Sequence, residues 1–142
     1  MNERISIELP GFGHANPIPV ASRIGPFMAS GALTGRDPVS ADMPLGLDQQ
    51  ITNVFAHVRA LVDAVGATTD SILKMTFHLA DPHDREALNR AWLAMFPDPE
   101  HRPARQVIAA RLDAPAQVHC DLLAVFPTSS AGSAGTPTPP AA

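Results

Sequence analysis

The chain has 142 residues and a mass of 15.0 kDa, with 45% hydrophobic residues, one Cys and no Tyr. This length fits one domain, and a single Cys excludes an internal disulfide framework and suits a reducing compartment. Ten Lys and Arg against fourteen Asp and Glu give a formal net charge of −4, which argues against nonspecific binding to nucleic-acid phosphates. We find no secretion signal, and no apolar run approaches the ~20 residues that cross a bilayer, so we expect a cytoplasmic protein.

The N-terminal part of the chain predicts short strands. Ile5 and Ile7 can begin a first strand, and two more are expected at residues 20–24 and 26–32. Gly25 lies between the last two and predicts a tight turn there.

Two amphipathic helices are expected in the middle of the chain. Apolar residues recur at helical spacing over residues 47–65, and Gly66 is a natural stop. The second helix begins with Asp81 as its cap and Pro82 at the first helical position, and it ends before Pro97.

The remaining elements are strands at residues 72–79, 106–112 and 118–126. In the first of them, alternation places Leu73, Met75, Phe77 and Leu79 on one face. The order of elements, β-β-α-β-α-β-β, predicts an α+β fold with both helices on one face of a sheet. The other face is left uncovered, so we expect the protein to associate with itself through it.

The domain organisation follows from composition. Residues 127–142 are rich in Pro, Ser, Gly, Thr and Ala and have no large apolar side chain, so we expect a flexible tail. Residues 1–126 form the predicted folded domain.

Arg105 and Asp121 are the charged residues whose positions draw attention. Arg105 precedes a predicted strand and can offer two parallel hydrogen bonds to a carboxylate, or it is a solvated surface residue. Asp121 lies inside an apolar strand, where charged residues are uncommon unless they are paired or functional. It either orients or activates a water molecule, or it is a structural partner of Arg111 or another Arg.

Other candidate chemistries are weaker. His119, Cys120 and Asp121 are consecutive, but neighbours in a strand point to opposite faces, so we expect Cys120 to be a core residue and not a nucleophile. The six His lack the spacing of a zinc site, and we expect no metal. Asn89 lies in a helix, where it either bonds a neighbouring loop or subunit or is simply exposed.

Several short motifs follow one another in a characteristic order: Ser30-Gly31 at a strand end, Gln50 ahead of the long helix, Lys74-Met75-Thr76, Asp81-Pro82-His83-Asp84, Asn89, Pro103-Ala104-Arg105 and an acidic residue in the last strand. Together they resemble the reactive intermediate deaminase (RidA/YjgF) family over residues 17–125. The resemblance implies a chorismate-mutase-like fold with one mixed sheet, and a homotrimer with a central barrel and sites between subunits. It also implies hydrolysis of enamines and 2-imino acids to 2-oxo acids and ammonia, with no cofactor.

The resemblance implies roles for particular residues. Arg105 is expected to hold the substrate carboxylate, and Asp121 stands in place of the family's water-positioning Glu. Ser30, Gly31 and Asn89 match further residues of the substrate site.

Two positions depart from the family pattern. Ile18 replaces the Tyr of the cleft, and Val107 replaces a Cys that is often found two residues after the Arg. An apolar residue at position 18 suits a larger or less polar imine.

Three other functions stay open at the level of the sequence. The cleft either binds 2-oxo acids without turnover or acts on one pathway-specific enamine, such as an aminomuconate-like compound. An endoribonuclease activity is also reported in the family, but the negative net charge disfavours it.

Overall fold

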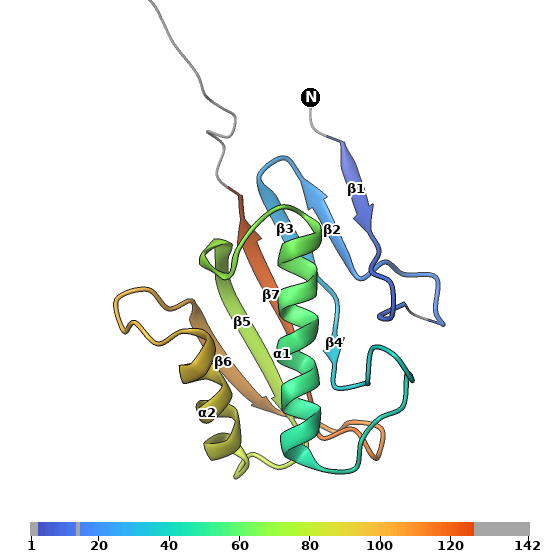
Figure 1. The fold of residues 1–142 in the computed structure, drawn as a ribbon, viewed down its shortest axis with the longest axis vertical. Helices are drawn as coiled ribbons and strands as arrows, with labels where there is room; N and C mark the ends of the chain where they lie inside the picture. Colours follow the sequence, from blue (N-terminus) through green and yellow to red (C-terminus); the bar gives the residue numbers. More distant parts are fainter. Residues whose placement is uncertain (1–2, 14, 127–142) are drawn as a thin grey trace, which may run out of the picture.

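The computed structural model describes residues 3–13 and 15–126. The predicted tail at 127–142 lies outside the described residues. Figure 1 shows two α-helices lying side by side across one face of a sheet. In chain order the elements are β1 (Arg4–Ile7), β2 (Ala21–Ile24), β3 (Phe27–Ser30), β4 (Leu33–Thr34), α1 (Leu47–Ala64), a 3₁₀ turn η1 (Thr69–Ser71), β5 (Ile72–Leu79), α2 (Arg85–Met95), β6 (Ala104–Ala109) and β7 (Val118–Val125).

The sheet has seven strands in the order β1-β2-β3-β7-β5-β6, and β4 pairs with β7 beyond the end of β3. The pair β5–β6 is parallel, with α2 as its crossover, and the other pairs are antiparallel. The predicted α+β fold with one mixed sheet and both helices on one face is confirmed.

The core lies between the helices and the sheet. The apolar stripe of α1 supplies Val54, Val58 and Leu61, all fully buried. Phe77 of β5 and Leu122 of β7 meet this layer from the sheet. The period of 3.6 in the helix and of 2 in the strands thus brings both apolar faces into one layer.

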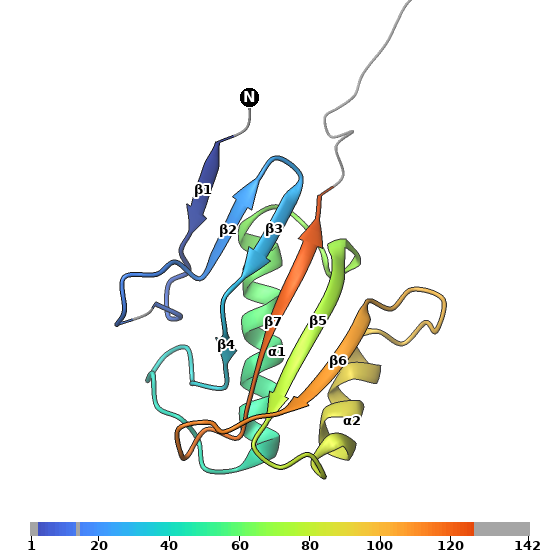
Figure 2. The ribbon, with the colours of Figure 1, turned by 180° about the vertical axis from the view of Figure 1, so that it is seen from behind.

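No helix of the described residues covers the opposite face of the sheet, as Figure 2 shows from behind. Several apolar side chains on it are exposed: Ile24, Phe27, Leu73, Ile108 and Leu123. We call this face the open face. Its exposed apolar area is typical of a surface that another chain covers.

The structure corrects three local predictions and adds one short strand. A β-bulge between Ile72 and Lys74 turns Leu73 out to solvent, so Ile72 enters the core in its place. The second helix begins at Arg85, because Asp81 accepts hydrogen bonds from His83 and closes a separate turn before it. Strand β6 runs over Ala104–Ala109 and not 106–112, and the short strand β4 (Leu33–Thr34) was not predicted, because two residues carry no periodic signal.

Gln50 ties α1 to two loops. Its amide nitrogen donates to the carbonyl oxygens of Pro44 (2.7 Å) and Pro115 (2.9 Å), and its oxygen accepts from the backbone N–H of Gln117 (2.8 Å). The Gln50 side chain is fully buried, so its amide group cannot bond to water, and these three hydrogen bonds take the place of water. Gly35 lets the chain pass close to this residue, because a Cβ there would lie 2.8 Å from the Gln50 carbonyl oxygen.

Candidate functional site

Arg105 is the second residue of β6, and its side chain points to the helix side of the sheet. It pairs with Met75 of β5, which is buried on that side. Its guanidinium carbon lies 5.1 Å from the centre of the Trp92 ring, a cation–π contact with α2. The Nη1 atom is buried, and no described group accepts a hydrogen bond from it. A planar cation with an unused donor can bind a carboxylate.

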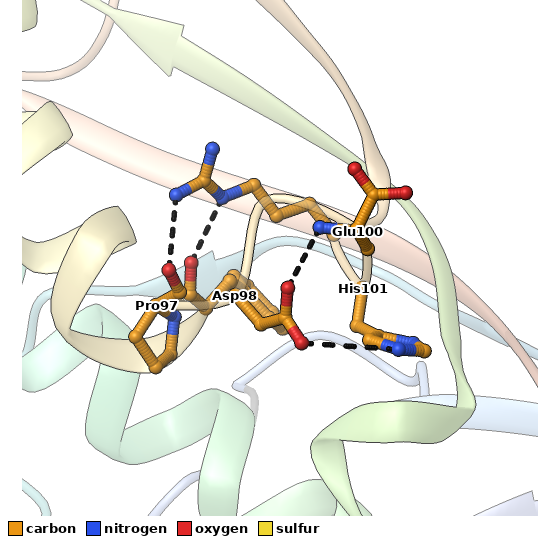
Figure 3. Close-up of polar contacts among 6 residues, drawn as sticks. Pro97, Asp98, Glu100 and His101 are labelled. Carbon is orange, nitrogen blue, oxygen red and sulfur yellow. Dashed lines mark hydrogen bonds and ion pairs between the residues drawn. The ribbon is translucent and has the colours of Figure 1, made fainter.

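The loop before β6 determines where this strand begins and therefore where Arg105 lies. Figure 3 shows this loop, in which Asp98 accepts a hydrogen bond from the backbone N–H of Glu100. The distance from Asp98 Oδ2 to His101 Nε2 is 3.8 Å. Arg102 donates to the carbonyl oxygens of Phe96 and Pro97 at the end of α2. Arg102 is thus used to hold the loop, whereas Arg105, three residues later, is not.

Asp121 lies on the open face. It pairs with Thr76 of β5 in the middle of β7, and the Cys120 and Leu122 side chains on either side of it are buried on the helix side. The predicted alternation of β7 is therefore confirmed. Among the described residues no ion pair joins Asp121 to Arg111 or to another Arg, so the structural alternative for this carboxylate finds no support.

Two histidines accompany Asp121 on the open face. His78 and His119 are paired across β5 and β7, with ring centres 4.8 Å apart. Burial, and then the charge of His78, lower the pKa of His119, while the nearby Asp121 carboxylate acts in the opposite direction. From the sequence alone these rings are only candidate metal ligands, because the strand register that pairs them is set by the fold.

Arg105 and Asp121 therefore lie on opposite faces of the sheet within one chain. Met75, the partner of Arg105, and Thr76, the partner of Asp121, are consecutive residues of β5. Side chains of consecutive strand residues point in opposite directions. One chain by itself does not bring the two charged groups into one cleft.

Ser30 and Gly31 lie where β3 ends. The Ser30 hydroxyl accepts a hydrogen bond from the backbone N–H of Leu122 (2.9 Å) and donates one to the Gly31 carbonyl (2.8 Å). The backbone N–H of Gly31 donates a hydrogen bond to the carbonyl oxygen of Val20 (2.9 Å), and Gly31 is exposed. Ser30 thus bonds β7 at the point where β3 ends, through Leu122, the residue that follows Asp121.

The other predicted residues fall into two places. Val107 follows Arg105 on the same face of β6, and Asn89 is exposed on α2, one turn before Trp92. Ile18 is exposed in the loop between β1 and β2. Asn89 on α2 and Arg105 and Val107 on β6 thus lie in one part of the fold, and Ser30, Gly31 and Asp121 lie at β3 and β7 in the middle of the sheet. Ile18 lies apart from both, in the loop before β2.

Cys120 is fully buried, and burial together with the Asp121 charge raises the pKa of its thiol far above the usual range. The prediction that it is a core residue is confirmed. In the described part of the chain, no group of three or more His, Cys, Asp and Glu side chains is arranged to hold a metal ion. Neither described helix is long and apolar enough to cross a membrane.

Comparison with known proteins identifies the family. Residues 23–126 match the family model described as Endoribonuclease L-PSP. The chain belongs to this family. A RutC family protein of Aquifex aeolicus is 25% identical over 115 residues, which cover 77% of this chain and 92% of that protein. The RutC family protein YoaB of Escherichia coli is 36% identical over 64 residues, 45% of this chain and 55% of YoaB.

Solved structures of the L-PSP family share the fold. YyfA of Yersinia pestis, described as a conserved Rid family protein of unknown function, superposes with a TM-score of 0.81 at 19% identity, over 87% of this chain and 100% of YyfA. RidA of the Antarctic bacterium Psychrobacter gives 0.79 at 21% identity, over 86% of this chain and 99% of RidA. The resemblance to the RidA/YjgF family is confirmed.

Proposed function

We propose that this L-PSP family protein is a deaminase that hydrolyses 2-imino acids and related enamines to 2-oxo acids and ammonia. The observation that carries the proposal is the buried, unused donor of Arg105 above the Trp92 ring. Burial lowers the pKa of Arg105 by disfavouring its charge, and a bound carboxylate would repay that cost. Every 2-imino acid carries such a carboxylate.

The proposed reaction needs a carboxylate base and water. The imine reacts as its protonated iminium ion, and an enamine reaches the same ion by taking up a proton at carbon. Asp121 accepts a proton from a water molecule as the water oxygen attacks the iminium carbon, which gives a neutral tetrahedral carbinolamine. Protonated Asp121 then gives this proton to the nitrogen. As the C–N bond breaks and ammonia leaves, the hydroxyl proton passes to the Asp121 carboxylate and the carbonyl forms. Positioning supplies much of the acceleration, because imines hydrolyse readily in water.

The proposed site lies between two copies of the chain. Arg105 and Asp121 point to opposite faces of one sheet, so one copy would offer the Arg and its neighbour the Asp. The open face supports self-association, because apolar side chains such as Phe27 (63% exposed) lie on it. We propose a homotrimer whose sheets line a central barrel, as the family resemblance implies.

The assembly is tested by sedimentation of the purified protein. We expect three times the mass of the 15.0 kDa chain. Phe27→Glu on the open face should give monomers, whereas Val39→Glu should not, since Val39 is exposed on a loop away from the sheet. A wild-type monomer would contradict the shared site.

The activity is tested in a coupled assay. An amino acid oxidase generates 2-imino acids from a panel of amino acids, and semicarbazide traps the imine in competition with the protein. We expect wild type to reduce semicarbazone formation and Arg105→Ala not to do so. Arg111→Ala is the matched control, because Arg111 is an exposed Arg just beyond the same strand.

A mixing experiment tests whether the site is shared. Arg105→Ala and Asp121→Asn should each be inactive alone. Mixed trimers made by refolding them together at equal amounts should recover about a quarter of the wild-type activity, because one interface in four then has both residues intact. No recovery in mixed trimers would show that one chain supplies both groups, and would overturn the shared site.

Ligand binding and RNA cleavage, measured on the same proteins, distinguish the rival functions. A wild-type protein that binds a 2-oxo acid tightly and hydrolyses no imine of the panel is a binding module or acts on a different enamine. Cleavage of RNA by wild type and not by Arg105→Ala would favour the ribonuclease activity named in the family description.

A further inference from the structure

A second positively charged side chain, that of Arg85, lies near Arg105. Arg85 is the first residue of α2, and Asn89 and Trp92 follow it at four and seven residues. Residues at these spacings share one face of a helix. Trp92 on this face contacts the Arg105 guanidinium, so Arg85, Asn89 and Arg105 border one region at α2 and β6.

Arg85 and Arg105 repel each other. The charge of Arg85, in addition to burial, lowers the pKa of Arg105. No ion pair to Arg85 is found among the described residues, although Asp84 and Glu86 flank it in sequence. A like charge nearby disfavours the charged form of Arg105, and a bound anion would offset this effect.

Arg90 of the same helix shows the contrasting case. Its guanidinium lies 3.4 Å from the Asp48 carboxylate of α1 and thus has an anion within the chain. For Arg85 and Arg105 no such ion pair is found in the part of the chain that the structure describes. A substrate with one carboxylate can engage the guanidinium of Arg105 and leaves Arg85 without a partner.

We infer that Arg85 binds a second acidic group of the substrate, so that the site takes the imine or enamine of an amino dicarboxylic acid. This rests on the proposed deaminase function. The carboxylate beside the imine carbon binds Arg105, and the distal carboxylate binds Arg85. Arg85 is then the residue that determines specificity, and it takes no part in the hydrolysis itself.

The test compares two imines of the same shape that differ in charge. Glutamate and glutamine, oxidised by a suitable amino acid oxidase, give 2-iminoglutarate and the corresponding side-chain amide. We expect wild type to have the higher kcat/KM for the diacid. In Arg85→Gln the ratio of the two kcat/KM values should fall about tenfold or more, since a charge-assisted hydrogen bond is lost. Arg90→Gln is the matched control and should leave the ratio unchanged.

The outcomes separate this inference from the proposed function. An unchanged ratio in Arg85→Gln, or a wild type that prefers the amide, overturns the role of Arg85 and leaves the deaminase intact. A wild type that accelerates neither imine overturns the deaminase and this inference with it. Because Arg85 is exposed, its variant should fold, and an unchanged melting temperature checks this.

Discussion

Replacing the buried amide of Gln50 tests how α1 is fixed to the loops around it. Gln50→Met keeps the side-chain length and the helix propensity but removes the hydrogen bonds to Pro44, Pro115 and Gln117. At about 1 kcal/mol net for each bond, the loss is about 3 kcal/mol of unfolding free energy. Met gains some apolar burial, so we expect a measured loss of about 2–3 kcal/mol.

The assay is equilibrium unfolding in urea at one fixed protein concentration, because an assembly makes stability depend on concentration. Gln49→Met is the matched control: Gln49 is exposed, and among the described residues its side-chain amide bonds the Asn53 side chain alone. It should cost about 0.5 kcal/mol or less. If Gln50→Met were no more destabilising than Gln49→Met, the three bonds would not fix the loops and the reasoning would fail.

Three more predictions concern stability and reactivity. Gly35→Ala should lower the free energy of unfolding by about 1–3 kcal/mol, because the new Cβ would lie 2.8 Å from the Gln50 carbonyl oxygen. Gly46→Ala is the control and should not lower it, since the space around Gly46 is open. Equal denaturation midpoints of the two variants would refute this. Cys120 should react with a thiol reagent only in denaturant, since burial raises its pKa and blocks access; labelling of the native protein would contradict its place in the core. Because the pKa of His119 is lowered in the folded state, the folded protein binds a proton there less readily than the unfolded chain does. Stability should therefore fall as the pH drops from about 6.5 through that lowered pKa. His119→Gln should flatten this dependence of stability on pH. A profile that keeps its slope in that variant would show that another group is responsible.

Much of the fold could be read from the sequence because its signals are local. The helical period over residues 47–65 and the alternation in β7 place apolar side chains on one face whatever the rest of the chain does. The failures are also local in origin. The β-bulge in β5 reverses Leu73, and the turn closed by Asp81 delays α2 to Arg85, because each depends on hydrogen bonds that a periodic pattern does not contain.

The candidate site was less accessible from the sequence. Motif order singled out Arg105 and Asp121, and the alternation of β7 correctly placed Asp121 on the face away from Cys120. Arg85 carries no motif of its own and stands out only because Arg105 lies close to it in space.

The sequence by itself determined the class of fold, the buried Cys120 and the charged residues that deserve attention, since composition, periodicity and motif order are properties of the chain alone. Only the tertiary structure decided that β5 pairs with both β6 and β7. Through this pairing Arg105 and Asp121 point to opposite faces, and Arg105 comes to rest on Trp92. The physical reason is that strand register and helix packing depend on contacts between residues distant in sequence, which a local pattern does not specify.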